Sequence, residues 1–358
     1  MAPVYFTPGP AQLYPTVAQH LQNGLDKQVF SLSHRSQAFK DLYRKADEGL
    51  RALFNLPQGY AIYFTGSATE IWERSLQNLT AQSSFHLVNG SFSKKYLSHA
   101  QWLGRQAQAV QVPFGEGFDI DALAVPQEAE LLAITQNETS SGVCMPVQDI
   151  HALRTYFPEP LLSVDMVSGA PYAALDFSKV DMAFFSVQKG FGLPAGLGVW
   201  LVNERCREKA AQLEGQQYTG GHYSIASLQE QYTQFQTPCT PNVLGIYLLA
   251  HVVEDLLAKS IAVIRQETEA KALKLYSFLE ESALFSPFVQ KPQHRSPTVV
   301  VANVEGRPAA EVITALKTQG LVVGSGYGAF KDRQIRIANF PAVSEADVDQ
   351  LLIALKKL

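Results

Sequence analysis

A lysine between an apolar run and a glycine-rich loop is the residue on which the chemistry of this sequence depends. Lys189 follows the strand-like segment 180–187 and directly precedes Gly190. Burial lowers the pKa of an amine, and a lysine with a lowered pKa is a nucleophile that forms Schiff bases with carbonyl compounds. A lone lysine is more often an exposed residue of a surface turn. The interpretation therefore depends on the groups that accompany it.

Three such groups follow other strand-like runs. The segment 66–69 lies between an apolar run and a helical pattern, where small residues and free backbone N–H groups favour an anion such as phosphate. Asp165 ends the apolar run 161–164, and a carboxylate there needs a cation or several hydrogen-bond donors. Phe92 follows the segment 89–91, and its ring can lie against a planar ligand.

Each group also has a simpler interpretation. The segment 66–69 is equally an ordinary strand-to-helix turn, Asp165 a helix N-cap or a metal ligand, and Phe92 a core residue. We expect no metal, because no second carboxylate or histidine lies close to Asp165 in the sequence. Taken together, the four groups match pyridoxal phosphate, which has a phosphate, a flat ring, a protonated ring nitrogen and an aldehyde.

The elements that must position these groups alternate along the first two-thirds of the chain. Strands are expected at 60–64, 85–88, 109–112, 131–135, 161–164, 181–187 and 198–202, with helical patterns between them. This alternation predicts an α/β fold, with a mostly parallel sheet covered by helices on both faces. In such sheets, ligands bind outside the carboxyl ends of the strands.

The pattern changes after Pro241. Two long helical patterns, at 242–258 and 261–281, precede further strands and helices. We therefore expect three parts: residues 1–15 as an N-terminal arm, 16–258 as a large domain, and 259–358 as a smaller α+β C-terminal domain. The arm is rich in proline and glycine, and docks either on its own chain or on a second subunit. Trp102 lies in a helical pattern and is expected in the core.

The composition limits the classes of partner. The 358 residues carry a net charge of −4, so we expect neither nucleic acid nor membrane as a partner. No apolar run is long enough to span a bilayer, and the first residues do not have the pattern of a secretory signal. The three cysteines are scattered and fit a reducing compartment. We expect a cytoplasmic protein.

In order and spacing, these segments resemble the class V group of fold-type I pyridoxal-phosphate-dependent aminotransferases, and within it the phosphoserine aminotransferase family. The matching segments cover nearly the whole chain: 6–10, 33–36, 137–139, Asp165, 188–189, 237–238 and Arg336. Asp165 and Lys189 stand 24 residues apart, as in that family.

The resemblance implies roles at the cofactor. Lys189 would form the Schiff base and later move the substrate Cα proton, and Asp165 would pair with the ring nitrogen. The other residues that the resemblance places at the cofactor are Ala68, Thr69 and Gln188 at its phosphate, Phe92 stacked on its ring, and Thr139 near its phenolic oxygen.

The resemblance also implies a homodimer with a shared active site. Gln236 and Thr237 would reach the phosphate of the cofactor from the partner subunit. Arg336 would bind the substrate α-carboxylate as a bidentate fork, and the pair His34 and Arg35 would contact the rest of the substrate.

Two departures from the family leave the substrate open. The family's second His-Arg pair is absent from residues 326–333, where Lys331 and Arg333 are the cations, and Thr69 stands where many relatives have arginine. The expected reaction converts 3-phosphohydroxypyruvate and L-glutamate to O-phospho-L-serine and 2-oxoglutarate, in serine biosynthesis. A serine or alanine aminotransferase that uses pyruvate or glyoxylate is the alternative.

Two other classes fit less well. A cysteine desulfurase-like lyase usually has histidine before the lysine, where this chain has Gln188, and needs a mobile cysteine in a late loop. A non-catalytic nucleotide-binding module is supported only by the glycine-rich segment 324–328, which does not match the dinucleotide-binding pattern.

Overall fold

Seven strands form the largest of three sheets in the computed structural model, which describes residues 2–358; the others have five strands and two. The strands are β2 (Ala61–Thr65), β3 (Ser83–Val88), β4 (Gln106–Gln111), β5 (Leu131–Thr135), β8 (Leu161–Asp165), β9 (Met182–Ser186) and β10 (Gly198–Val202). Their order is β2-β10-β9-β8-β5-β3-β4, and only β10 runs antiparallel to its neighbours. The mostly parallel α/β sheet expected from the sequence is confirmed.

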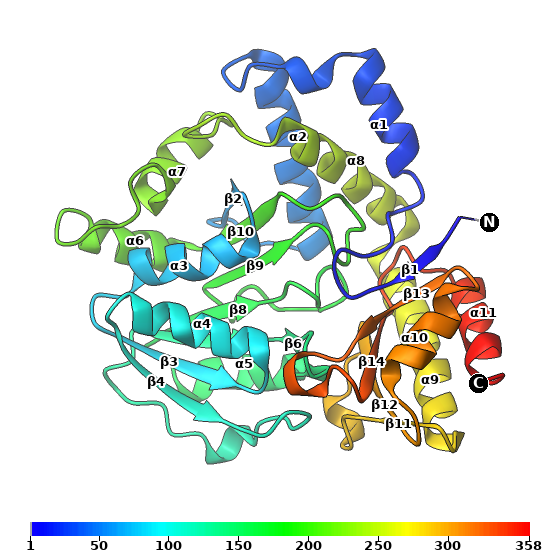
Figure 1. Ribbon diagram of the computed structural model, residues 1–358. Helices are drawn as coiled ribbons and strands as arrows, with labels where there is room; N and C mark the ends of the chain where they lie inside the picture. The colour runs from blue at the N-terminus through cyan, green and yellow to red at the C-terminus, as the bar shows by residue number, and fades with distance from the viewer. Residues whose placement is uncertain (1) are drawn as a thin grey trace.

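Helices cover both faces of this sheet (Figure 1). One face carries α2 (Gln37–Phe54), α5 (Val147–Tyr156) and α8 (Val243–Lys259), and the other carries α3 (Ala68–Leu79), α4 (Ser91–Trp102), α6 (Glu204–Leu213) and α7 (Ile225–Tyr232). Along β2, Ile62 packs toward the first set and Tyr63 toward the second, because successive side chains of a strand point to opposite faces. Strands buried on both faces are rich in apolar residues, as β9 and β10 are.

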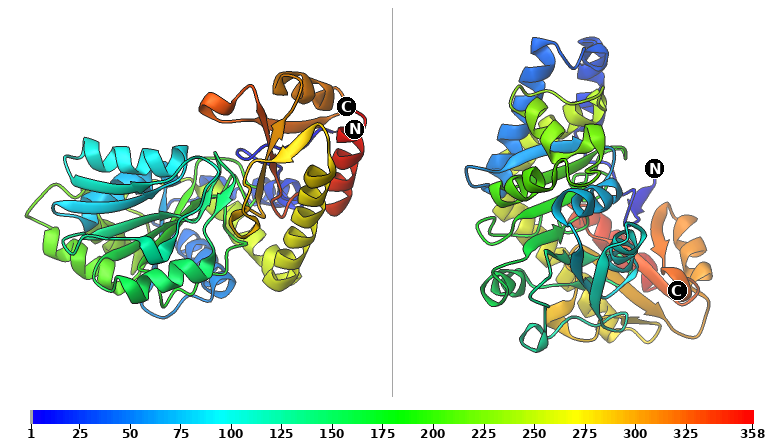
Figure 2. Two further views of the ribbon diagram at one scale, coloured as in Figure 1. Left: turned by 90° about the horizontal axis from the view of Figure 1, so that it is seen from below. Right: turned by 90° about the vertical axis from the view of Figure 1, so that its left-hand side faces the viewer.

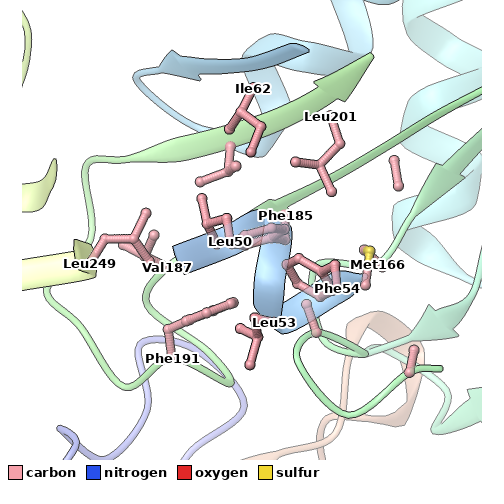
Figure 3. Packing of buried hydrophobic residues seen from close by; sticks show 14 of the residues in the cluster. Leu50, Leu53, Phe54, Ile62, Met166, Phe185, Val187, Phe191, Leu201 and Leu249 are labelled. Carbon is pink, nitrogen blue, oxygen red and sulfur yellow. The ribbon is translucent and has the colours of Figure 1, made fainter. Parts of the chain in front are cut away.

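A stack of side chains anchors the loop that contains Lys189. Phe185 and Phe191 lie on either side of it in the sequence, and their rings stack at 4.7 Å between centroids. Leu50 and Phe54 of α2 belong to the same buried cluster (Figure 3). Full burial of each such side chain contributes about 1.5–3 kcal/mol. The loop is therefore held at both ends by the core.

The smaller sheet lies beside the larger one (Figure 2). Its order is β1 (Val4–Phe6), β13 (Leu321–Ser325), β14 (Gln334–Ala338), β12 (Val299–Val304) and β11 (Phe285–Pro287). It packs with α9 (Ile261–Glu281), α10 (Ala309–Lys317) and α11 (Glu345–Leu355). The sequence analysis missed β1, which is only three residues long and pairs in parallel with the distant β13.

The N-terminal arm docks on its own chain. Ala11 donates its backbone N–H to the carbonyl of Gln188 at 3.0 Å, and Tyr14 donates to that of Gly192 at 2.8 Å. Gly9 has a φ of +128°, and a Cβ added there would lie 3.0 Å from Cε of Lys189. The arm therefore forms one wall of the space around this lysine.

The remaining elements are α1 (Val17–Asp26), the pair β6 (Asn137–Glu138) and β7 (Val143–Cys144), and 3-10 turns at Val29–Ser31, Ile120–Ala122, Gly221–Tyr223, Pro292–His294 and Gly328–Phe330. Between residues 2 and 358, no helix has the length and apolar character needed to cross a membrane. Trp102 ends α4 and is 75% exposed, so its expected place in the core is wrong. The division of the chain near residue 258 stays a prediction, although only Ser260 separates α8 from α9.

Candidate active site

One pocket collects most of the residues that the sequence singles out. It lies at the carboxyl ends of β5, β8 and β9, beside the first turns of α3 and α4. The residues that line it are Ala68, Thr69, Trp72, Phe92, Thr135, Asn137, Thr139, Asp165, Val167, Ser186, Gln188 and Lys189. Seven of these are sequence candidates for cofactor contacts: Ala68, Thr69, Phe92, Thr139, Asp165, Gln188 and Lys189.

Lys189 is buried in this pocket, with 7% of its surface exposed. Its Nζ donates a hydrogen bond to Oγ1 of Thr139 at 3.0 Å and lies 5.2 Å from the centroid of the Phe92 ring. Burial lowers the pKa of Lys189 to about 8, against the opposing effect of the negative charge of Asp165. The amine is therefore neutral in a substantial fraction of molecules near neutral pH, as a nucleophile requires.

A chain of hydrogen bonds fixes the hydroxyl that faces this amine. Thr139 donates its Oγ1–H to Oγ of Ser168 at 2.7 Å, and Ser168 donates to the carbonyl of Asn137 at 2.8 Å. The side-chain amide of Asn137 donates back to Ser168 Oγ at 2.8 Å. Because the hydrogen of the Thr139 hydroxyl is committed to Ser168, its oxygen is left to accept from Lys189.

Asp165 ends β8 as a fully buried carboxylate. Its Oδ1 accepts the backbone N–H of Val167 at 2.9 Å, and its Oδ2 accepts the indole N–H of Trp72 at 2.9 Å. Burial raises the pKa of Asp165 to about 6, although these two donors and the charge of Lys189 oppose the rise. Asp165 forms no ion pair with any cation among residues 2–358. A buried carboxylate in this state suits a cationic ligand.

The sequence analysis missed Trp72. The indole N–H of a buried tryptophan needs an acceptor, and α3 places Trp72 four residues after Ala68, on the same helical face. The four-residue spacing from Ala68 was the sequence signal that could have placed Trp72 at the pocket.

Glu138 is a second residue whose position the sequence analysis did not interpret. Its buried carboxylate accepts the backbone N–H of Phe92 at 3.1 Å, that of Ser93 at 2.9 Å, and the N–H and hydroxyl of Ser140 at 3.1 and 2.6 Å. A Cβ at Gly90 would lie 2.3 Å from Cγ of Glu138, so only glycine fits there. Glu138 thus holds the start of α4 and, through it, the ring of Phe92.

The opposite end of the pocket suits an anion. Ala68 begins α3, and its N–H donates to Oγ of Ser186 at 2.7 Å, while Ser67 caps the helix by accepting from Glu70. Oε1 of Gln188 is buried without a hydrogen-bond partner. Buried polar atoms of this kind are rare and usually mark a ligand or water contact. This oxygen accepts hydrogen bonds and would meet a donor rather than an anion. The helix start, the carboxylate of Asp165 and the amine of Lys189 together fit pyridoxal phosphate.

Arg336, in β14, reaches the pocket from the smaller sheet. Its Nη1 donates to the carbonyl of Thr139 at 3.2 Å, and its Nε donates to that of Ser325 at 2.7 Å. Its guanidinium lies 5.4 Å from the centroid of the Tyr327 ring. Burial lowers the pKa of Arg336 from its ordinary value, but an arginine remains charged at neutral pH. The guanidinium of Arg336 therefore lies beside Thr139, the same residue whose hydroxyl oxygen accepts the hydrogen bond from Lys189.

Besides Arg336, which contacts Thr139 but does not itself line the pocket, four sequence candidates lie outside it in the single chain. Arg35 donates to the side-chain oxygens of Gln231 and Gln236, at some remove from Lys189 in the fold. Thr237 lines a separate pocket with Gly66 and Cys239, and His34 lines neither. The structure thus brings Arg35 and Gln236 together, but not with Lys189.

None of the three cysteines lines the pocket that contains Lys189. Burial raises the pKa of Cys144 to about 12, which suppresses the thiolate, and Cys206 is fully buried behind the sheet. The loop 326–330 does not form a separate nucleotide site, because Tyr327 packs on Phe92 with 5.4 Å between ring centroids.

Comparisons with known proteins agree with this geometry. The family model "Aminotransferase class-V" matches residues 4–351. A phosphoserine aminotransferase from Nocardioides sp. is 30% identical over 331 residues, covering 90% of this chain and 87% of that protein. The one from Rhodococcus opacus is 29% identical over 347 residues, covering 96% and 91%.

Solved structures show the same relationship. The crystal structure of a phosphoserine aminotransferase from Cytophaga hutchinsonii is 46% identical, with a TM-score of 0.97 and coverage of 99% of this chain and 98% of that one. An aspartate aminotransferase of subgroup IV from Thermus thermophilus is 25% identical, with a TM-score of 0.86 and coverage of 99% and 98%.

The fold and the pocket define a pyridoxal-phosphate-dependent enzyme of fold type I. The chain belongs to the class V aminotransferase family, and it is a transaminase. The family, the fold class and the cofactor expected from the sequence are confirmed. The roles of individual residues stay predictions.

Proposed function

We propose that this transaminase converts 3-phosphohydroxypyruvate and L-glutamate to O-phospho-L-serine and 2-oxoglutarate. The observation that carries the proposal is the pairing of Lys189 and Asp165 on the walls of one pocket, with Arg336 beside it. The substrate is supported by the names of the relatives, above all the 46% identical phosphoserine aminotransferase from Cytophaga hutchinsonii.

Within this proposal, each end of the cofactor has its own residues. Gln188, Ala68 and Thr69 would hold the phosphate, since the start of α3 lies in the pocket and the side-chain amide of Gln188 also carries N–H donors. Phe92 would lie against the ring, at the position that Glu138 fixes. Thr139 would meet the phenolic oxygen, because its hydroxyl already faces the amine of Lys189.

The proton transfers are assigned to two groups. When bound, pyridoxal phosphate supplies an aldehyde and a cationic ring that accepts the electron pair of a breaking Cα–H bond. Asp165 would keep a proton on the ring nitrogen, because Val167 and Trp72 orient its oxygens and stabilise its charge. Lys189 would take the proton from the substrate Cα, since an amine with a pKa of about 8 is a suitable base near neutral pH.

Arg336 would bind the α-carboxylate of every substrate. A guanidinium donates two parallel hydrogen bonds to a carboxylate, and its contact with the carbonyl of Thr139 sets its orientation relative to Lys189. The substrate Cα would then lie between the carboxylate clamp and the amine, which is the arrangement that proton abstraction needs.

We further infer that the enzyme works as a cytoplasmic homodimer. Gln236, Thr237, His34 and Arg35 lie away from the pocket of their own chain, and the contact of Arg35 with Gln236 makes them one connected group. Such a group fits the proposal that it completes the pocket of a partner subunit. All three cysteines are free, which suits a reducing compartment.

The test is a half-reaction. Purified holoenzyme is mixed in turn with phosphoserine, serine, alanine and glutamate, and the loss of the visible absorbance of the lysine-bound cofactor is followed. We expect phosphoserine and glutamate to react fastest. If alanine and serine react fast and phosphoserine does not, the alternative holds. That alternative is an amino acid transaminase that uses pyruvate or glyoxylate, and it is consistent with the exposed positions of Lys331 and Arg333.

A further inference from the structure

A lysine lies next to Phe92, one of the residues that line the pocket, and is outside the set of residues assigned above. Lys95 belongs to α4, three residues after Phe92, and this spacing places both on one side of the helix. Its Nζ lies 5.2 Å from the centroid of the Phe92 ring and 5.6 Å from that of Tyr327. It also donates a hydrogen bond to the hydroxyl of Tyr327 at 3.0 Å. The ammonium group thus lies near two rings, that of Phe92, which lines the pocket, and that of Tyr327, which packs on Phe92.

Tyr327 lies between two cations. Arg336 contacts the same ring, at 5.4 Å from its centroid, and belongs to the smaller sheet, whereas Lys95 belongs to the larger unit. A substrate with an α-carboxylate and a second anion at the end of its side chain presents two negative charges along one short chain. The two cations beside Tyr327 match that pattern, with Arg336 for the α-carboxylate and Lys95 for the distal group.

We propose that Lys95 is the group of this chain that receives the distal anion of the substrate, a phosphate or a side-chain carboxylate. The proposal rests on the proposed function, and it names the residue that gives preference for acidic substrates. The ammonium of a lysine has three donors, and Tyr327 occupies one of them, so two remain for an anion. All of its contacts in the described chain are with ring faces and a neutral hydroxyl, which leave its charge available.

The other cations near the pocket either have hydrogen-bond partners already or lie away from it. Arg336 is assigned to the α-carboxylate, and Arg35 donates to glutamine side chains outside the pocket of its own chain, so in the proposed dimer only the partner subunit's Arg35 would reach the substrate. The pair that the sequence analysis considered as substitutes, Lys331 and Arg333, is exposed beyond the turn 328–330. Within one chain, Lys95 is therefore the cation that lies beside both Phe92 and Tyr327 and has donors left for an anion.

The experiment compares Lys95→Met with Lys94→Met, its exposed neighbour, which contacts neither ring. The half-reaction of each holoenzyme is measured with phosphoserine, glutamate and alanine. For Lys95→Met we expect the apparent Kd of phosphoserine to rise about tenfold, as for a lost charge-assisted hydrogen bond, and that of alanine to stay within about twofold. Lys94→Met should match the wild type with all three, and Lys95→Arg should restore phosphoserine binding.

Tyr327→Phe gives a second, independent measurement. It removes the hydroxyl that orients Lys95 while keeping the ring, so we expect a smaller loss confined to phosphoserine and glutamate. If the wild type reacts with phosphoserine and Lys95→Met reacts equally well, the role of Lys95 is overturned and the proposed function stands. If the wild type reacts with alanine and with neither acidic substrate, both proposals are wrong.

Discussion

The indole N–H of Trp72 donates to Oδ2 of Asp165 at 2.9 Å and is the only side-chain donor to that carboxylate in the described chain. Burial raises the pKa of Asp165 from 3.8 to about 6 in the folded chain. The folded state is therefore favoured by this group below about pH 4, and that contribution is lost as the pH rises through about 6. Trp72 limits the loss because it stabilises the charged form.

Replacing Trp72 with phenylalanine should destabilise the apoprotein more at pH 8 than at pH 4. The expected difference is about 1.5–3 kcal/mol, the usual contribution of a hydrogen bond to a charged group. Urea unfolding at several pH values measures it. Trp200→Phe is the control, because Trp200 is also buried but its Nε1 has no partner. An equal loss of stability at both pH values for Trp72→Phe would contradict the role of the indole.

The lowered pKa of Lys189 predicts how fast the apoenzyme captures its cofactor. Only the neutral amine attacks an aldehyde, so the rate should rise about tenfold per pH unit below pH 8 and level off above it. Stopped-flow absorbance after mixing apoenzyme with pyridoxal phosphate gives this profile, and Lys189→Arg shows the background. A rate that keeps rising to pH 10 would mean that the amine has its ordinary pKa.

Glu138→Gln should disturb the position of Phe92 without touching the cofactor. The carboxylate of Glu138 now accepts hydrogen bonds from several buried donors. The amide of glutamine would turn an N–H group toward some of them, and the loss of these hydrogen bonds costs on the order of 3 kcal/mol. We expect a lower free energy of unfolding and a changed circular dichroism of the bound cofactor. Glu208→Gln, at an exposed position on α6, should change neither. An unaltered cofactor signal in Glu138→Gln would show that Phe92 is held by other contacts.

Gly9→Ala tests the contact between the arm and Lys189. A new Cβ would meet Cε of Lys189 at 3.0 Å, so cofactor attachment should weaken as well as stability. Gly59 also has a positive φ, +92°, but no atom lies within 4 Å of an added Cβ. Gly59→Ala should therefore cost only the backbone strain, about 1–2 kcal/mol, and leave the visible absorbance unchanged. Comparing the two variants separates the effect of backbone strain from that of the contact with Lys189. Equal cofactor binding in both would contradict the role of the N-terminal arm as a wall of the pocket.

The sequence predicted the elements whose pattern is local and repeated. The strand at 198–202 and the helix at 261–281 are found at these bounds. A continuous apolar run predicts a buried strand and apolar residues at helical spacing predict a helix, and both patterns can be seen within the element's own sequence. Groups that follow strands of a parallel sheet, such as Asp165 and Lys189, were brought into one pocket as expected, since the carboxyl ends of such strands share one edge.

What the sequence could not indicate were contacts between distant segments. Trp102 and Trp72 both lie on helices, yet one is exposed and the other donates to Asp165, because helix orientation is set by packing against the sheet. The pairing of β1 with β13 depends on backbone groups that carry no residue signal.

The sequence by itself indicated the fold class, the family and seven of the groups that line one pocket, because these groups lie next to strand ends with an evident pattern. Only the tertiary structure decided the surroundings of those groups. These are the indole that donates a hydrogen bond to Asp165, the arm beside Lys189, and the ring of Tyr327 near Lys95 and Arg336. The pairs Trp72 with Asp165 and Lys95 with Tyr327 are each more than 90 residues apart in the sequence. Such contacts arise from the packing of the whole chain.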